Sequence, residues 1–380
     1  MKTPFIYLDY NASTPIDSIV FEQMYPYLTG IYGNPSSIHN QGQEAKNAIE
    51  VARQQVADLI GANADEIIFT SGGTEANNHA IIGAAMNQKE KGNHIITSAI
   101  EHPAVTKVCE YLESQGFSIT YIGVDREGII KLEELKNAIT DKTILISIMH
   151  ANNEIGSIQP IEQIGKIARK NNIIFHTDAS QSVSKIHTKV DDLQVDLLTI
   201  AGHKIYGPKG IGALYVRKGI KLHNLMFGAG HEKGLRPGTE NVPLIVGLGK
   251  AAEISGTDFT KNTEHMRNIR NYLLQILYDL NIDMSINGNL LKCLPNTLNV
   301  SFKNIDANTL IYDLREQLAI SAGSACHSGE VKLSNVIKAV LSDAEYAKGT
   351  IRFSVGKNTT SDEIDHTMLL FKSYFVKTAI

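Results

Sequence analysis

The chain has 380 residues and a formal net charge of −4. Its composition, 43% hydrophobic and 20% charged, provides a sizeable core and excludes an intrinsically disordered chain. The near balance of 36 basic and 40 acidic residues gives no reason to expect a direct nucleic-acid partner. At roughly 150 residues per domain, the length predicts about two or three domains.

The cysteines and the apolar segments indicate the compartment. Cys109, Cys293 and Cys326 lie far apart and form no CxxC pair, which argues against a disulfide framework or a Cys-rich zinc site and favours a reducing cytoplasm. No continuous apolar stretch precedes Asp9, so the start is a poor signal peptide. No segment approaches the ~18 uninterrupted apolar residues of a membrane span. We therefore expect a soluble cytoplasmic protein without a membrane segment.

Helical and strand-like patterns alternate through the first two thirds of the chain. The spacing of apolar residues predicts helices at 45–59, 75–86 and 161–170. Short apolar runs predict strands at 67–70, 94–97, 118–122, 143–149, 173–176 and 197–200. This alternation predicts an α/β domain with a mostly parallel sheet.

The C-terminal third has a different pattern. We expect helices at 260–280, 335–341 and 361–376, and strands at 296–302, 319–321 and 350–355. The helical pattern is interrupted at Gly256–Asp258, where we place a domain boundary.

Two motifs at strand ends suggest an anion site and a buried carboxylate. In TSGGTEANN, a glycine turn with Thr74 at a helix start presents backbone N–H groups to an anion, although an ordinary helix cap is the simpler interpretation. In IIFHTDASQS, Asp178 ends an apolar run, so it is partly desolvated and requires a cation or a strong donor. A helix cap or a metal ligand are the alternatives for Asp178.

Two further motifs carry nucleophiles. In TIAGHKIYGPKG, Lys204 follows an apolar strand, where a lowered pKa would allow a Schiff base; an exposed loop lysine is the alternative. In SAGSACHSG, Cys326 stands among small residues that suit an accessible thiol, and a buried structural cysteine is the alternative. We expect that structural role for Cys109 and Cys293.

Weaker signals are set aside. The segment 247–252 matches a relaxed dinucleotide fingerprint, but no clear strand precedes it. His102, His203 and Cys326 are too dispersed for zinc ligands, so we predict no metal. His39 and His150 are interpreted as structural or surface residues.

The anion site, the carboxylate and the lysine are the three groups that pyridoxal 5′-phosphate (PLP) requires of a protein. Ten segments appear in series: YLDYNASTP, YGNPSSIH, TSGGTEANN, EHPAV, HANNEIG, HTDASQS, GHKIYGPKG, RPGTEN, SAGSACHS and IRFSVGKNTT. In these segments the chain resembles, over essentially its whole length, the cysteine desulfurases of the class V aminotransferase family.

The resemblance implies an α/β PLP-dependent fold of type I, like that of aspartate aminotransferase. It implies a large PLP-binding domain at residues 13–257 and a smaller α+β domain formed by residues 1–12 and 258–380. A homodimer is expected because this family builds its site across two subunits.

The resemblance also implies roles for individual residues. Lys204 is expected to form the Schiff base and then act as the base, Asp178 to pair with the pyridine nitrogen and Gln181 to bind the ring hydroxyl. His102 is expected to stack on the ring and assist proton transfer. The phosphate ligands implied are Gly73, Thr74, His203 and, from the partner subunit, Thr239.

The substrate L-cysteine is expected to bind through its carboxylate to Asn153 and Arg352, the latter by a two-pronged contact. Cys326 is expected to attack the substrate sulfur, leaving a persulfide for a sulfur-acceptor protein and releasing alanine. One position departs from the family: Ala201 stands where a serine phosphate ligand is common, and a lost hydroxyl weakens phosphate binding unless another donor replaces it.

Other functions stay open at this stage. Segments around Lys204, Thr239 and Cys326 locally resemble selenocysteine lyase, which acts on L-selenocysteine; we favour cysteine because the thiol segment is intact. An aminotransferase would make Cys326 incidental, and a non-enzymatic sulfur carrier would leave the cofactor residues unused. The sequence does not identify the sulfur acceptor, whether in iron–sulfur assembly, tRNA thiolation or DNA sulfur modification.

Overall fold

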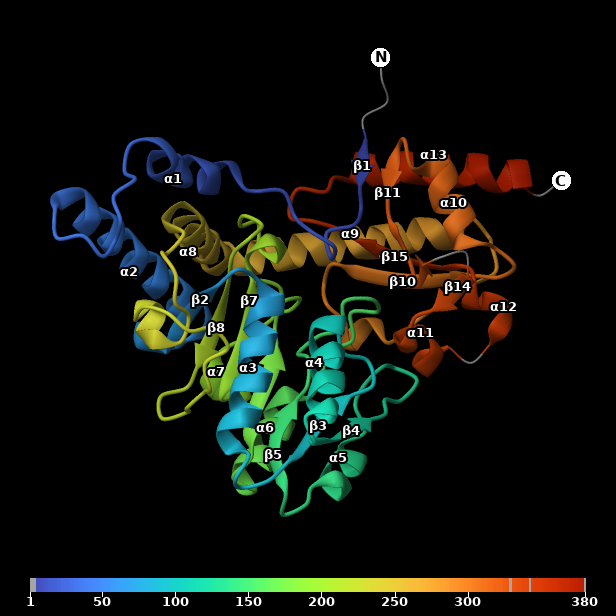
Figure 1. Cartoon of the computed structure of the whole chain (residues 1–380). Coiled ribbons are helices and arrows are strands. Elements are labelled where there is room, and N and C mark those ends of the chain that lie inside the picture. The colour runs from blue at the N-terminus through green and yellow to red at the C-terminus, as the bar shows by residue number, and fades with distance from the viewer. Residues whose placement is uncertain (1–4, 328–329, 342, 379–380) are drawn as a thin grey trace.

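A computed structural model of the chain describes residues 5–327, 330–341 and 343–378. Two sheets, each with its own hydrophobic core, form a larger and a smaller unit side by side (Figure 1). Among the described residues, no helix combines the length and the hydrophobicity needed to cross a membrane.

The larger unit is built on a seven-stranded sheet with the strand order β2-β8-β7-β6-β5-β3-β4. Its strands are β2 (Ile67–Thr70), β3 (His94–Ser98), β4 (Ser118–Ile122), β5 (Thr143–Ser147), β6 (Ile174–Asp178), β7 (Leu197–Ala201) and β8 (Gly212–Val216). β8 runs antiparallel to β2 and β7 while the other pairs are parallel, which confirms the mostly parallel sheet. The sequence pattern predicts every strand of this sheet except β8.

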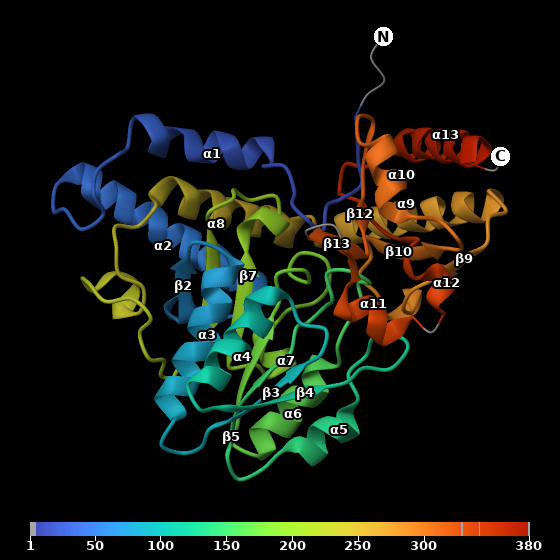
Figure 2. The same ribbon diagram turned by 45° about the vertical axis from the view of Figure 1, so that its right-hand side comes forward.

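Helices cover both faces of this sheet (Figures 1 and 2). Successive strand residues point to opposite faces, so Ile67 and Phe69 join one core while Ile68 joins the other. The first core includes residues of α2 (Asn40–Ile60), α6 (Ile161–Lys170) and α8 (Val242–Thr257), and the second those of α3 (Gly73–Gln88) and α4 (Pro103–Ser114). The remaining helices of this part are α1 (Ser18–Thr29), α5 (Leu132–Ala138) and α7 (Val190–Leu193), with 3-10 turns at Ala64–Glu66, Gly202–Lys204 and His231–Gly234.

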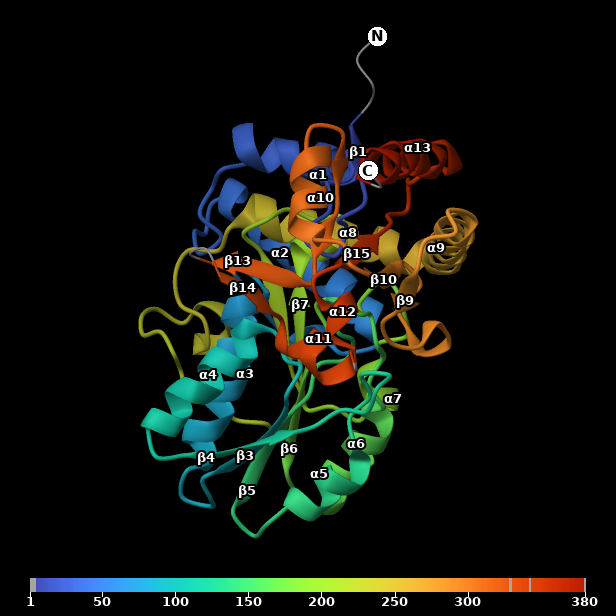
Figure 3. The ribbon, with the colours of Figure 1, turned by 90° about the vertical axis from the view of Figure 1, so that its right-hand side faces the viewer.

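The smaller unit contains an antiparallel sheet with the order β12-β15-β10-β9. These strands are β9 (Met284–Ile286), β10 (Thr297–Phe302), β12 (Ser321–Ala322) and β15 (Thr350–Ser354). The helices of this part are α9 (Phe259–Asp279), α10 (Ala307–Leu314), α11 (Asn335–Val340), α12 (Ala344–Ala347) and α13 (Ser361–Thr378), with a 3-10 turn at Leu290–Lys292. A hairpin of β13 (Ser324–His327) and β14 (Glu330–Leu333) extends from this unit on the side of the molecule where α4 lies (Figure 3).

The N-terminus belongs to the core of this smaller unit. β1 (Ile6–Tyr7) pairs in parallel with β11 (Leu318–Ala319), and Leu8 belongs to the same hydrophobic core as Phe353 and Phe371. The long helices α8 and α9 meet at Asp258. On this packing we propose the division into residues 13–257 and residues 1–12 with 258–380.

One predicted strand is divided in the structure. The pattern predicts a single strand at 319–321, whereas the chain forms β11 and β12 on either side of Ile320. The reason is that β11 pairs with β1 and β12 pairs with β15, so the chain passes from one sheet to another at this residue.

Candidate functional site

A cavity of about 320 Å³ lies where β6 and β7 end, and eight of the predicted site residues line it. They are Gly73, Thr74, His102, Asn153, Asp178, Gln181, His203 and Lys204. Ala201, which departs from the family pattern, also lines the cavity. The other lining residues, to which the sequence analysis gives no role, are Ala12, Asn77, Ala104, Met149, Ala151 and Ser180. The cavity therefore joins segments from six separate motifs.

The start of α3 forms one end of the cavity. Gly72 is the N-cap residue of α3, and no side chain caps the helix. Glu75, in the first turn, is held by Arg236 at 3.0 Å and accepts a hydrogen bond from the backbone N–H of Ser71. The exposed N-terminus of α3, with the Thr74 hydroxyl beside it, suits an anion better than the ordinary cap that the sequence left open.

Asp178 at the end of β6 is the buried acid of the cavity. It is 7% exposed, and its carboxylate accepts hydrogen bonds from Asn77 Nδ2 at 2.7 Å and from the backbone N–H of Ser180 at 2.9 Å. The buried Asn77 Oδ1 has no hydrogen-bond partner among the described residues. No group of three metal-binding side chains occurs in those residues, so nothing there supports the metal-ligand alternative for Asp178.

Lys204 follows β7 and reaches toward the N-terminal segment. Its Nζ donates hydrogen bonds to the backbone oxygens of Asn11 and Ala12. Burial, and then the positive charge of Arg352, lowers the pKa of Lys204 to about 8. A neutral amine is therefore accessible near neutral pH, unlike that of an exposed loop lysine.

Two histidines of the cavity are neutral imidazoles. His102 is exposed at the cavity, but desolvation by the surrounding protein lowers its pKa. Its Nδ1 accepts a hydrogen bond from the Ala104 N–H at 3.1 Å. Burial, and then the charge of Lys204, lowers the pKa of His203 to about 4. A neutral His203 meets an anion as a hydrogen-bonding group without a positive charge.

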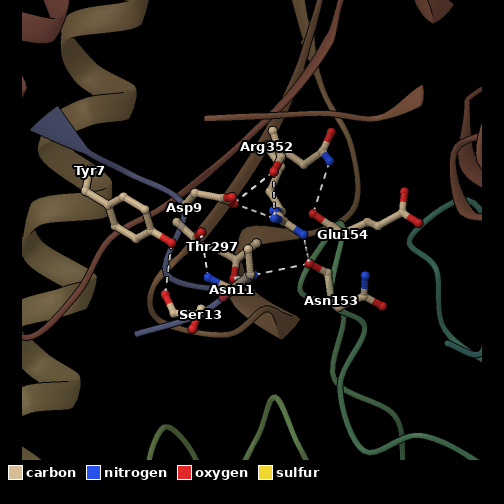
Figure 4. A network of polar contacts seen from close by, with 12 residues as sticks. Tyr7, Asp9, Asn11, Ser13, Asn153, Glu154, Thr297 and Arg352 are labelled. Atoms are coloured by element: carbon tan, nitrogen blue, oxygen red, sulfur yellow. Dashed lines mark hydrogen bonds and ion pairs between the residues drawn. The ribbon is translucent and has the colours of Figure 1, made fainter. Parts of the chain in front are cut away.

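Asn11 connects the cavity to the smaller unit, and the sequence analysis did not identify it. Its backbone oxygen also accepts a hydrogen bond from Gln181 Nε2 at 2.9 Å. Its side-chain Nδ2 donates to Thr297 Oγ1 at 2.9 Å and to the backbone oxygen of Asn153 at 3.3 Å (Figure 4). Asn11 lies in YLDYNASTP, one of the segments that carry the family resemblance, but nothing in that segment distinguishes Asn11 from its neighbours.

Arg352 lies one contact behind the cavity, on β15. Its Nη1 donates to the backbone oxygen of Asn153 at 2.9 Å, and its Nη2 donates to Asp9 Oδ1 at 2.5 Å and to Ser321 Oγ at 2.9 Å (Figure 4). The buried Nε has no partner among the described residues. The guanidinium is thus held by Asp9 and retains an unused donor.

Of the two remaining predicted site residues, Thr239 does not line the cavity and Cys326 is described only by its backbone. Thr239 is exposed. The backbone of Cys326 lies in β13, opposite Val331 of β14, and its side chain lies outside the described part of the structure. Cys109 and Cys293 have free thiols, and burial raises their pKa values to about 12 and about 11, which disfavours the reactive thiolate form of both.

The residues of the cavity fit PLP. An uncapped helix start suits its phosphate, Asp178 is a buried acceptor for its ring nitrogen, and Lys204 provides an amine of lowered pKa. Gly73 leaves the space at the helix start open, because a Cβ there would lie 3.0 Å from Ser180 Oγ.

Comparison with known proteins agrees with this chemistry. The model of the aminotransferase class-V family matches residues 6–367. The chain is 48% identical over 364 residues to "Cysteine desulfurase IscS" of Dictyoglomus turgidum, covering 96% of this chain and 92% of that protein. It is also 48% identical over 377 residues to the protein of that name from Escherichia coli K12, covering 98% and 93% of the two chains.

Solved structures of similar proteins agree with the family match. A "NifS-like protein" superposes with a TM-score of 0.92 at 38% identity, covering 98% of this chain and 99% of the other. The structure "SspA in complex with cysteine" gives 0.82 at 40% identity, covering 93% and 100%. Both the family model and these relatives span nearly the whole chain, and the chain accordingly belongs to the class V aminotransferase family.

Proposed function

We infer that this protein is a PLP-dependent cysteine desulfurase, which converts L-cysteine to L-alanine and retains the sulfur as a persulfide on Cys326. One observation carries this conclusion: a single cavity holds the amine of Lys204, the carboxylate of Asp178 and a helix start, in a chain 48% identical to cysteine desulfurases over 96% of its length. A solved relative that is described as a complex with cysteine supports cysteine rather than selenocysteine as the substrate.

The phosphate end of the site would consist of the α3 start and the neighbouring imidazole. Gly73 and Thr74 would offer backbone N–H groups and a hydroxyl, and His203 a ring nitrogen. Asp178 would hold the ring nitrogen, since Asn77 and the Ser180 N–H already fix its carboxylate. Gln181 would bind the ring hydroxyl.

Lys204 would carry the cofactor and afterwards move the substrate proton. Bound PLP supplies an electron sink that makes the Cα–H of an attached amino acid acidic. An amine whose pKa is about 8 is close to the operating pH, so Lys204 can both accept and return a proton at Cα. His102, neutral at this pH, would contact the face of the ring and assist proton transfer.

The carboxylate of the substrate would bind at the Asn153–Arg352 contact. Asn153 lines the cavity, and Arg352 donates to its backbone oxygen while keeping an unused Nε–H. A guanidinium that Asp9 holds in place loses little conformational freedom when the carboxylate arrives.

Sulfur transfer would use the thiol of Cys326. The thiolate forms an S–S bond to the substrate sulfur as the C–S bond of the substrate breaks, and the carbon takes up a proton to give alanine. The persulfide then needs an acceptor thiol, for which we propose a sulfur-acceptor protein. We further propose a homodimer in the cytoplasm, where the thiols of Cys109 and Cys293 would stay reduced.

Alanine formation by the PLP-loaded protein tests this function. Under reducing conditions we expect turnover of L-cysteine, without any added ketoacid, at a rate that equals or exceeds turnover of L-selenocysteine. Activity on selenocysteine alone would identify a selenocysteine lyase instead. Amino-group exchange that requires a ketoacid would identify an aminotransferase, and a protein that takes up no cofactor would favour a non-enzymatic carrier.

Two variants separate cofactor binding from sulfur transfer. Lys204→Ala should abolish the visible absorbance of covalently attached PLP. Cys326→Ala should keep that absorbance and lose alanine formation from cysteine. Turnover by Cys326→Ala at the parental rate would refute the persulfide mechanism.

A further inference from the structure

The cavity lacks a hydroxyl at residue 201 and has one on the adjacent strand end. Ala201 is the last residue of β7, and Ser180 lies two residues beyond the end of β6. These neighbouring parallel strands pair Asp178 with Thr199, and the Ala179 N–H continues the ladder to the Thr199 oxygen at 3.1 Å. Residue 180 therefore lies level with residue 201 at the same edge of the sheet.

Both side chains face the start of α3. A Cβ placed on Gly73 would lie 3.0 Å from Ser180 Oγ and 3.3 Å from the Cβ of Ala201. Ser180 and Ala201 thus border the same small space, which is open because Gly73 has no side chain. An oxygen from either strand end reaches the anion-binding end of the cavity.

The Ser180 hydroxyl is available as a donor. The Ser180 N–H is bonded to Asp178 Oδ1 at 2.9 Å, which fixes the turn and keeps the side chain on the cavity wall. Within residues 5–327, 330–341 and 343–378, no hydrogen bond engages Ser180 Oγ. This hydroxyl is therefore free to donate at the point where Ala201 offers only a methyl group.

We propose that Ser180 supplies to the cofactor phosphate the hydroxyl donor that Ala201 lacks. The proposal depends on the function above only in requiring a phosphate-bearing cofactor. A phosphate oxygen that loses a charge-assisted hydrogen bond in a partly desolvated site is left unsatisfied, so the donor contributes measurably to affinity. The donor hydroxyl thus comes from the end of β6 instead of the end of β7, and the start of α3 keeps its role.

The test measures how strongly the full-length, PLP-depleted protein binds pyridoxamine 5′-phosphate and pyridoxamine, by titration calorimetry. Pyridoxamine is the matched ligand without a phosphate, and neither compound forms a bond to Lys204. Four proteins are compared: the parent, Ser180→Ala, Ala201→Ser and the double variant. Ser180→Ala should weaken binding of pyridoxamine 5′-phosphate roughly tenfold and leave pyridoxamine unchanged. Ala201→Ser should restore the affinity in the Ser180→Ala background.

Three results would overturn the proposal: unchanged phosphate-ligand affinity in Ser180→Ala, an equal loss for both ligands, or no rescue by Ala201→Ser. Equal thermal unfolding temperatures of the four proteins control for misfolding. Failure of the proposed function is recognised separately, since a parent that binds pyridoxamine 5′-phosphate but forms no alanine from cysteine refutes the desulfurase alone.

Discussion

The amine of Lys204 is buried close to a second cation, and this sets the pH at which it reacts. Burial lowers its pKa to about 8, with Arg352 acting in the same direction. Only the neutral amine attacks an aldehyde, so covalent uptake of PLP by the cofactor-depleted protein should accelerate with rising pH. We expect a midpoint near 8, far below the ~10.4 of an exposed lysine. Stopped-flow absorbance across a pH series measures it.

Arg352→Met provides the control for the electrostatic part of this prediction. Removal of a nearby positive charge favours the protonated amine, so the midpoint of Lys204 should move upward in this variant. A parental midpoint close to that of an exposed lysine would contradict the burial argument. An unchanged midpoint in Arg352→Met would contradict the role of the neighbouring charge.

At the scale of the element, the start of α3 can bind an anion because no side chain caps the helix and Gly73 leaves the space open. Gly73→Ala would place a methyl group 3.0 Å from Ser180 Oγ and 3.3 Å from the Ala201 Cβ, in the space that we assign to phosphate. We expect it to weaken binding of pyridoxamine 5′-phosphate at least tenfold. The unfolding temperature should be unchanged or slightly higher, because alanine favours the helix.

Gly256→Ala is the matched control for that substitution. Gly256 lies in α8, and a Cβ there meets only Leu59 Cδ1 at 3.8 Å, an ordinary contact. Its affinity for pyridoxamine 5′-phosphate should equal that of the parent. If Gly73→Ala also binds this ligand as the parent does, the α3 start is not the phosphate site.

The elements predicted from the sequence are those that a clear local pattern of apolar residues marks. β2 and β4 begin and end at the predicted residues, because short apolar runs between turns have few alternative structures. Helix α1 was not predicted: Ile19, Phe21 and Tyr25 are each more than half exposed, so no core-facing periodicity marks it. β8 was also missed; its short apolar run begins directly after the turn at residues 207–210.

The site was predictable to a similar extent. The chemistry of Lys204 and Asp178 followed from charged residues at strand ends, and the roles of the other residues followed from the family resemblance. The role of Asn11 could not be predicted, because its contact with Lys204 joins residues 193 positions apart in the sequence. The available hydroxyl of Ser180 could not be predicted either, since only the pairing of β6 with β7 brings it level with Ala201.

At the scale of the whole molecule, one helix presents an apolar face that the described residues of the chain leave exposed. Helix α1, at the edge of the molecule in Figures 1 and 2, exposes Ile19, Phe21, Tyr25 and Leu28, each by more than half. An apolar face of this kind is typical of a subunit interface. Thr239 is exposed and lies outside the cavity of its own chain, which suits a residue that serves the site of a partner.

Subunit complementation tests the shared site. Lys204→Ala removes the amine of one chain, and Thr239→Asp places a negative charge against the phosphate of the neighbouring site, so each homodimer should be inactive. In a mixed dimer, the intact Lys204 of one chain meets the intact Thr239 of the other, which restores one site. After unfolding and refolding together, random pairing should recover about one quarter of the parental rate of alanine formation. Full activity of Thr239→Asp alone, or no recovery on mixing although light scattering shows dimers, would mean that each chain builds its site by itself.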